Sequence, residues 1–196
     1  MTPARGPYAK TAAVRRGILE AALEVFAERG YRATTMSAVA ERAEFSQRGL
    51  VHHFPTKEAL LAGVLADYDE DVGRRMPRVT GLAAIEALID VTQRDAAQPV
   101  IVELYAILSA EATSPDHPAH AHYRRRYELF RQYLVEQFTI IHDSGLLRTS
   151  LDAETVARLF VAVLDGLQAQ WLYDRDGIDI AASLRQFLGE FVILQS

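Results

Sequence analysis

The segment 35–57 constrains the fold of this chain more than any other, because it holds signals for two short helices in close succession. Thr35 has the hydroxyl side chain that is typical of an N-cap, and it predicts a helix of about two turns. Ser46 predicts a second cap for a short helix over 47–53, and Pro55 ends that helix. Helices this short cannot bury their apolar faces alone, so the pattern is typical of a helix-turn-helix supported by a third helix.

The rest of the chain has apolar residues at helical spacing, and no segment shows the sustained alternation of a strand. The supporting helix is predicted over Thr11–Arg29, where Gly30 ends it, and the helix after Pro55 over Lys57–Met76. Five further helices are separated by proline and glycine residues: Leu82–Asp95, Pro99–Thr113, His120–Asp143, Ala153–Asp174 and Ile178–Leu194. The sequence therefore predicts an all-α fold of about nine helices.

Two domains are predicted along the chain. Residues 1–56 form an N-terminal three-helix domain whose helix-turn-helix motif spans 35–54, and residues 57–196 form a C-terminal helical domain. The helix over 57–76 connects them, and the stretch 77–81 is the best candidate for a hinge, because it begins with proline and ends with glycine.

The charge of the chain is unevenly distributed. The net charge is −5, but residues 1–60 carry nine Lys and Arg against six Asp and Glu, which leaves a net charge of −8 on the remainder. A mildly basic N-terminal part on an acidic body fits a protein that touches phosphates at one end only.

The composition also excludes several classes of protein. The absence of cysteine excludes disulfides and thiolate metal sites. The N-terminus has no apolar run of the kind that a signal peptide has, and no apolar run is long enough to cross a bilayer. We therefore expect a cytoplasmic protein that does not enter a membrane.

The helix over 47–53 presents a surface suited to the edges of DNA bases. Leu50 and Phe54 lie four residues apart and are expected to turn inward, which leaves Gln47 and Arg48 facing outward. Glutamine and arginine are the side chains that bind purine edges with two hydrogen bonds. The residues expected to contact bases or phosphates are Thr35, Ser46, Gln47, Arg48, Gly49, Val51, His52, His53 and Lys57.

Three members of this set have roles that follow from their positions. Gly49 has no side chain, so it lets the backbone come close to a duplex. Thr35 and Lys57 lie at predicted helix N-termini, where free N–H groups and the helix dipole favour anionic phosphates.

With these residues in place, the sequence resembles the tetracycline-repressor (TetR) family of one-component transcriptional regulators. The resemblance covers about residues 11–65 and rests on Phe26, Gly30, Tyr31, Thr34, Thr35, Val39, Ala40, Ala43, Ser46, Leu50, His53, Phe54, Thr56, Lys57, Glu58 and Leu60. The family usually has Gly-Val in the turn where this chain has Glu44-Phe45, and a tyrosine where this chain has Val51. The second departure removes a hydroxyl that commonly contacts phosphate, so Arg48 or His52 is expected to carry more of that contact.

The resemblance implies a ligand-responsive DNA-binding regulator that is not an enzyme. Its N-terminal domain would bind a palindromic double-stranded operator, and its C-terminal domain would bind a ligand and form a homodimer. A symmetric dimer would read two half-sites about one helical turn, ~34 Å, apart. An unknown small molecule would release the DNA, so repression is the favoured direction, although activation stays open.

Two long helices are predicted to form the dimer interface. Each has an apolar stripe at helical spacing, over 120–143 and over 153–174, and small residues in the second would let another helix approach. The residues assigned to the interface are Tyr127, Phe130, Leu134, Phe138, Val156, Phe160, Val163 and Leu167. The alternative is that both stripes face the core of their own chain.

The ligand pocket is assigned to the region around the helix over 99–113, which is apolar nearly all round. Glu103 on this helix is a candidate contact for a cationic or hydroxylated ligand, but an ion pair with a nearby arginine or exposure to solvent is favoured. Tyr105 and Trp171 are candidate pocket walls, for which a core position is an equal alternative.

A metal site and a catalytic site are both disfavoured. Asp116, His117, His120 and His122 straddle Pro118, so no single helix face gathers them, and a solvated loop is expected. We expect neither a metal nor a cofactor. The alternatives to a regulator are an α-helical enzyme or carrier, for which the sequence offers no Gly-rich phosphate loop and no Ser/His/Asp set, and a protein–protein adaptor.

Overall fold

A computed structural model describes residues 7–193, and every regular element within this range is helical. The helices are α1 (Pro7–Ala33), α2 (Met36–Arg42), α3 (Gln47–His53), α4 (Lys57–Arg75), α5 (Leu82–Ala96), α6 (Pro99–Glu111), α7 (His120–Asp143), α8 (Ala153–Tyr173) and α9 (Ile180–Phe191). The only extended pairing in this range is an isolated antiparallel bridge between Leu147 and Val192. The predicted all-α fold of about nine helices is therefore confirmed.

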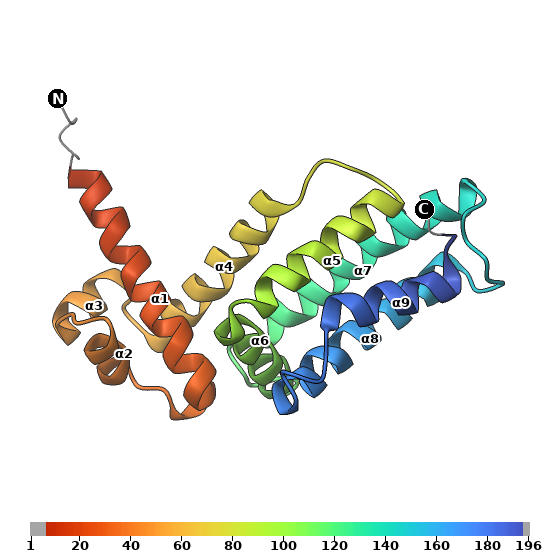
Figure 1. Cartoon of the computed structure of the whole chain (residues 1–196). Coiled ribbons are helices and arrows are strands. Elements are labelled where there is room, and N and C mark those ends of the chain that lie inside the picture. The colour runs from red at the N-terminus through yellow and green to blue at the C-terminus, as the bar shows by residue number, and fades with distance from the viewer. Residues whose placement is uncertain (1–6, 194–196) are drawn as a thin grey trace.

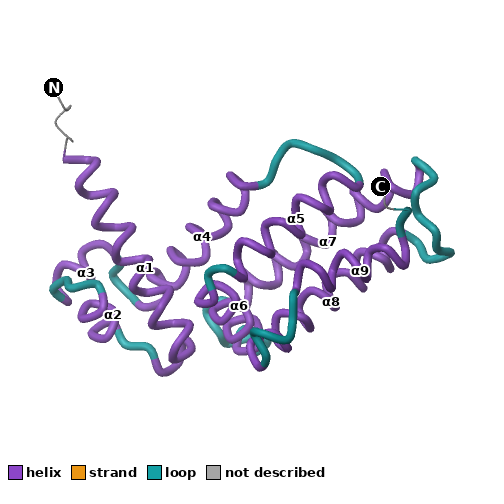
Figure 2. Tube along the Cα trace, viewed as in Figure 1, coloured by secondary structure: helices purple, strands orange, loops and turns teal. Residues whose placement is uncertain are grey.

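Figure 1 shows an elongated molecule with α1, α2 and α3 at one end and α5 to α9 at the other. The helix α4 runs from the first group toward the second, and the long loop that follows it leads into α5 (Figure 2). Within the described residues, no helix is long and apolar enough to cross a membrane.

The two short helices begin where the sequence predicts. The Thr35 hydroxyl accepts a hydrogen bond from the backbone N–H of Ala38 at 3.1 Å, and the Ser46 hydroxyl accepts one from Gly49 at 3.1 Å. These bonds satisfy N–H groups that the first turn of a helix leaves without partners. The predicted N-caps are confirmed, and they fix where α3 starts.

Two apolar clusters form the core. The first holds Leu50 and Phe54 and continues without a break from α1 through α4 into α6 and the start of α7. The second lies among α5, α7, α8 and α9, together with Val102 of α6. The first cluster therefore ties the three N-terminal helices to the body, and the predicted boundary between residues 56 and 57 stays a prediction.

The observed helix boundaries differ most from the predicted ones in α1, which begins at Pro7 rather than Thr11, and in α9. The first helix continues to Ala33, because the chain turns at Gly30 with φ 69° and ψ 172° and then resumes a helical path. The last helix begins at Ile180, because the Asp179 side chain accepts from the N–H of Ala182 at 2.9 Å and so acts as its N-cap. It ends at Phe191 rather than at the predicted Leu194, because Val192 leaves the helical conformation with φ −127° and ψ 141°.

Candidate functional site

The outer face of α3 is the candidate nucleic-acid surface. Leu50 is fully buried and Phe54 is 3% exposed, as expected for residues that anchor the helix. Gln47, Arg48 and His52 are exposed on the opposite side. The rest of the predicted set comprises Thr35, Ser46 and Val51, which are exposed, and Gly49, His53 and Lys57, which are half-buried.

The turn before α3 contains Glu44 and Phe45, which stand where the family usually has Gly-Val. Glu44 has a positive φ of 51°, the left-handed conformation that glycine adopts most easily. The ring of Phe45 lies against Gly49, where an added Cβ would come within 2.5 Å of its Cε1 atom. Gly49 is therefore needed for packing inside the motif, which is a role that sequence reasoning missed.

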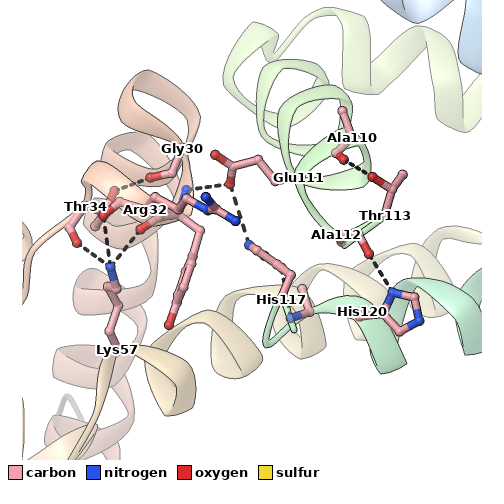
Figure 3. Close-up of polar contacts among 12 residues, drawn as sticks. Gly30, Arg32, Thr34, Lys57, Ala110, Glu111, Ala112, Thr113, His117 and His120 are labelled. Carbon is pink, nitrogen blue, oxygen red and sulfur yellow. Dashed lines mark hydrogen bonds and ion pairs between the residues drawn. The ribbon is translucent and has the colours of Figure 1, made fainter. Parts of the chain in front are cut away.

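Lys57 has a structural role that sequence reasoning also missed. Its ammonium donates to the carbonyl oxygens of Tyr31, Arg32 and Thr34 at 2.8, 3.3 and 2.9 Å, as Figure 3 shows for the last two. It also lies 4.3 Å from the centre of the Tyr31 ring. An ammonium has three protons, and all three have acceptors here. A phosphate contact by Lys57 stays a prediction.

The N-terminal helices meet the body at a contact between α1 and α6. The side chain of Glu111, the last residue of α6, accepts a hydrogen bond from the backbone N–H of Tyr31 at 2.9 Å (Figure 3). His117 packs edge-on against the Tyr31 ring at 4.9 Å, and its Nε2 lies 3.7 Å from Glu111. We call Gly30, Tyr31, Glu111 and His117 the α1–α6 contact.

This position of His117 corrects the prediction of a solvated loop. Its side chain is buried, with the residue only 6% exposed, and burial lowers its pKa, so the imidazole is neutral at neutral pH. His120 donates from Nδ1 to the carbonyl of Ala112 at 2.8 Å. His122 lies apart from both, in the wall of the cavity described below. Between residues 7 and 193, no group of three or more His, Asp or Glu side chains is arranged so that it could hold a metal ion.

A cavity of about 820 Å³ lies in the body, between α4, α5, α6, α7 and α8. Its volume falls in the range of sites that bind small organic molecules, ~300–1,000 Å³. One part of its wall is polar and aromatic, formed by Tyr68, Asp69, Tyr105, His122, Tyr123 and Arg126. Another part is apolar, formed by Val72, Leu88, Ile101, Val102, Phe130 and Leu164.

The structure places one of the three predicted pocket residues in this cavity. Tyr105 lines it. Glu103 does not, because it forms an ion pair with Arg175, which is the alternative that the sequence favoured. Trp171 is buried in the second apolar cluster with Arg175 over its ring, so its assignment as a pocket wall is corrected.

Four of the eight residues assigned to the dimer interface are corrected, and the assignment of the other four stays a prediction. Leu134, Phe138, Val156 and Phe160 are at most 2% exposed in the single chain, so they belong to its own core. The other four assigned residues are half-buried: Tyr127 and Phe130, which line the cavity, and Val163 and Leu167 on α8. Helical periodicity identified apolar faces correctly, but it does not distinguish a face that contacts the same chain from one that contacts a second chain.

Comparisons with known proteins match both parts of the chain. Residues 18–64 match the family described as "Bacterial regulatory proteins, tetR family", and residues 77–193 match "BetI-type transcriptional repressor, C-terminal". The HTH-type transcriptional regulator UidR of Escherichia coli is 23% identical over 160 residues, which cover 79% of this chain and 80% of that protein.

Two solved structures have the same arrangement of helices. A TetR-family transcriptional regulator from Agrobacterium tumefaciens superimposes with a TM-score of 0.77 at 18% identity, over 93% of this chain and 99% of that one. A putative transcriptional regulator from Saccharomonospora viridis, solved in complex with choline, superimposes with a TM-score of 0.75 at 21% identity, over 93% and 100%. These likenesses show the shared fold.

Proposed function

Because this chain belongs to the TetR family of bacterial regulatory proteins, we propose that it represses transcription by binding a palindromic operator as a homodimer, and that a small molecule in the body cavity releases it. The observation that carries the proposal is the orientation of α3, which buries Leu50 and Phe54 and exposes Gln47 and Arg48. Its relatives are regulators rather than enzymes, and we propose the same for this chain, acting in the cytoplasm where bacterial DNA lies.

Within this proposal, the exposed residues of α3 divide into two groups. Gln47 and Arg48 have the side chains that bind base edges, so they would supply sequence preference. Thr35 and Ser46, at the N-termini of α2 and α3, would contact phosphates and set the position of the protein on the duplex.

Replacing Arg48 with alanine tests this division. We expect the variant to lose about 1–3 kcal/mol of binding free energy on a duplex selected by the wild-type protein, and to tolerate changes at one base position of each half-site. Fluorescence anisotropy on the selected duplex and its single-base variants measures both effects. Arg74→Ala is the matched control, because Arg74 is exposed on α4 with surface ion pairs only. Equal binding by the two variants would refute the assignment.

The route from cavity to DNA-binding end passes through α6. This helix lines the cavity with Ile101, Val102 and Tyr105, and it ends at Glu111, which holds the backbone of Tyr31. A ligand that binds more tightly when α6 is in one of two placements would shift the equilibrium between the DNA-binding and the released states. A nearly complete switch requires a differential affinity of about 5.5 kcal/mol.

We propose that the dimer forms through an exposed stripe of α8. The stripe consists of Leu159, Ala162, Val163, Gly166, Ala169 and Tyr173, which recur at helical spacing. Val163 also packs in part against the second apolar cluster. Leu159 is 39% exposed and Tyr173 is 94% exposed, so large apolar surfaces face solvent in the single chain. An added Cβ on Gly166 would meet only Gln170, at 4.0 Å, so a second helix has room to approach.

Replacing Leu159 with arginine is expected to turn the dimer into a monomer, because two copies would place like charges in an apolar interface. Sedimentation velocity measures the change, and operator affinity should fall with it. Val79→Arg is the matched control, since Val79 has the same exposed fraction but lies in the loop between α4 and α5. A dimer that survives the Leu159 change would refute an interface centred on this stripe.

A further inference from the structure

The cavity wall carries buried polar atoms that have no hydrogen-bond partner. They are the hydroxyls of Tyr105 and Tyr123 and the Nε2 atom of His122. Tyr105 is 8% exposed and Tyr123 is 5% exposed, and burial raises the pKa of both phenols well above the usual range. Both are neutral at neutral pH, so each of these cavity-lining residues carries a buried O–H group that lacks an acceptor.

Three of the four carboxylates that line the cavity, in contrast, already accept hydrogen bonds, and the fourth, Glu136, is exposed to solvent. Asp69 accepts from Arg126, Asp95 from Tyr68 and Arg75, and Asp165 from Tyr127. The buried atoms that remain without partners are therefore hydroxyls and an imidazole nitrogen rather than carboxylate oxygens. A buried polar group without a partner is costly, so a ligand that supplies an acceptor oxygen gains from this wall.

The aromatic part of the wall is poorly suited to a cationic ligand. The guanidinium of Arg126 lies over the rings of Tyr68 and Tyr105, with its Cζ 5.5 and 4.8 Å from their centres. These are the faces that would attract an ammonium group, and a cation of the chain itself already occupies them. The same guanidinium is paired with Asp69 through Nη1, and its other N–H groups can donate to a negative charge placed beside the two free hydroxyls.

On the basis of the proposed function, we infer that the effector is a small apolar carboxylate. Its carboxylate would accept from the hydroxyls of Tyr105 and Tyr123 within reach of the charge of Arg126, and its apolar body would lie against Val102 and Leu164. These donors would offset the free-energy cost of burying the charge of the carboxylate in the cavity. The free hydroxyls gain partners in the same step.

Isothermal titration calorimetry on the full chain tests the head group. The probes are hexanoate, decanoate and 4-phenylbutyrate, each with the alcohol and the primary amine of the same carbon skeleton. We expect at least one carboxylate to bind about tenfold more tightly than both of its matched partners. Preference for the amine or the alcohol in every set, or no carboxylate binding at about 1 mM, would overturn the inference.

Tyr105→Phe and Tyr123→Phe locate the head group. Each variant removes a buried oxygen that has no partner in the free chain, so we expect a Tm equal to or above that of the wild type and an affinity for the best carboxylate that is about tenfold weaker. Thr139→Val removes a hydroxyl from an exposed residue of α7 that lines neither the cavity nor the proposed dimer stripe, and it should leave the affinity unchanged. Wild-type affinity in both cavity variants would refute this placement.

Operator binding measured on the same preparations separates this inference from the proposed function. If the ligand-free protein binds the operator but prefers no carboxylate, the inference fails and the regulator remains. If the protein binds no DNA under any condition, the proposed function fails, whatever the cavity binds. If the preferred carboxylate also releases the operator from the wild-type protein, with a weaker effect in the two phenylalanine variants, both are supported.

Discussion

Replacing Phe54 with alanine is expected to lower the free energy of unfolding by about 3–5 kcal/mol and to abolish DNA binding. Phe54 is the buried C-cap of α3, and its ring packs tightly on α4, where an added Cβ on Gly63 would come within 2.8 Å of it. The guanidinium of Arg15 lies over the ring at 4.9 Å, so contacts with α1 are lost as well. Urea denaturation followed by circular dichroism gives the change in stability.

His53→Ala is the matched control for this change. His53 is adjacent in the sequence but half-buried, so its loss should reduce stability by much less than that of Phe54. A Phe54→Ala protein as stable as the His53→Ala protein would show that α3 does not depend on this anchor. The orientation of the Gln47 and Arg48 side chains would then have no structural basis.

The second large effect is expected for Gly30→Ala. With φ 69° and ψ 172°, Gly30 has a conformation that is essentially restricted to glycine, and alanine there should lose about 1–3 kcal/mol of stability from backbone strain. The new Cβ would lie 2.5 Å from Oε1 of Glu111, so Glu111 must move from its bond to Tyr31. We expect weaker operator binding, because the α1–α6 contact loosens. Thermal unfolding and anisotropy measure the two effects.

Gly17→Ala provides the matched control. Gly17 is exposed within α1, and an added Cβ there would meet nothing within 4 Å. The substitution should raise stability by about 0.5–1 kcal/mol, since alanine favours a helix over glycine. If Gly30→Ala shifts stability in the same direction as Gly17→Ala, the strained conformation and the close approach of Glu111 are both refuted.

The local features of the N-terminal helices could be predicted from the sequence. Thr35 and Ser46 are N-caps because their hydroxyls reach N–H groups three residues ahead, which is a relation within one turn. Leu50 and Phe54 are buried because a spacing of four residues places them on one face of a helix. Such relations depend on neighbouring residues, so one sequence is enough to find them.

Contacts between distant residues could not be predicted in the same way. Tyr31 and Glu111 are 80 residues apart, and no local pattern indicates that the carboxylate of one helix holds the backbone of another. Lys57 was predicted to face phosphates for the same reason, because its three carbonyl partners lie 23 to 26 residues earlier. The charge of each residue was visible in the sequence, but its partner was not.

The exposed stripe of α8 shows a different limit of prediction from sequence. Phe160 and Leu159 are adjacent on α8, yet Phe160 is buried in the core and Leu159 faces solvent. Apolar residues surround much of this helix, so periodicity alone gives two candidate faces. Only the packing of α6, α7 and α9 on α8 shows which of these faces is exposed in the single chain.

Selection from a library of random duplexes tests the central claim most directly. The claim is that two copies of the chain present the outer face of α3 to two half-sites of one operator. The account predicts that the wild-type protein enriches a palindrome whose half-sites lie about one helical turn apart, and that Leu159→Arg does not enrich it. A protein that enriches no motif, or enriches a single half-site without a symmetric partner, would contradict the account.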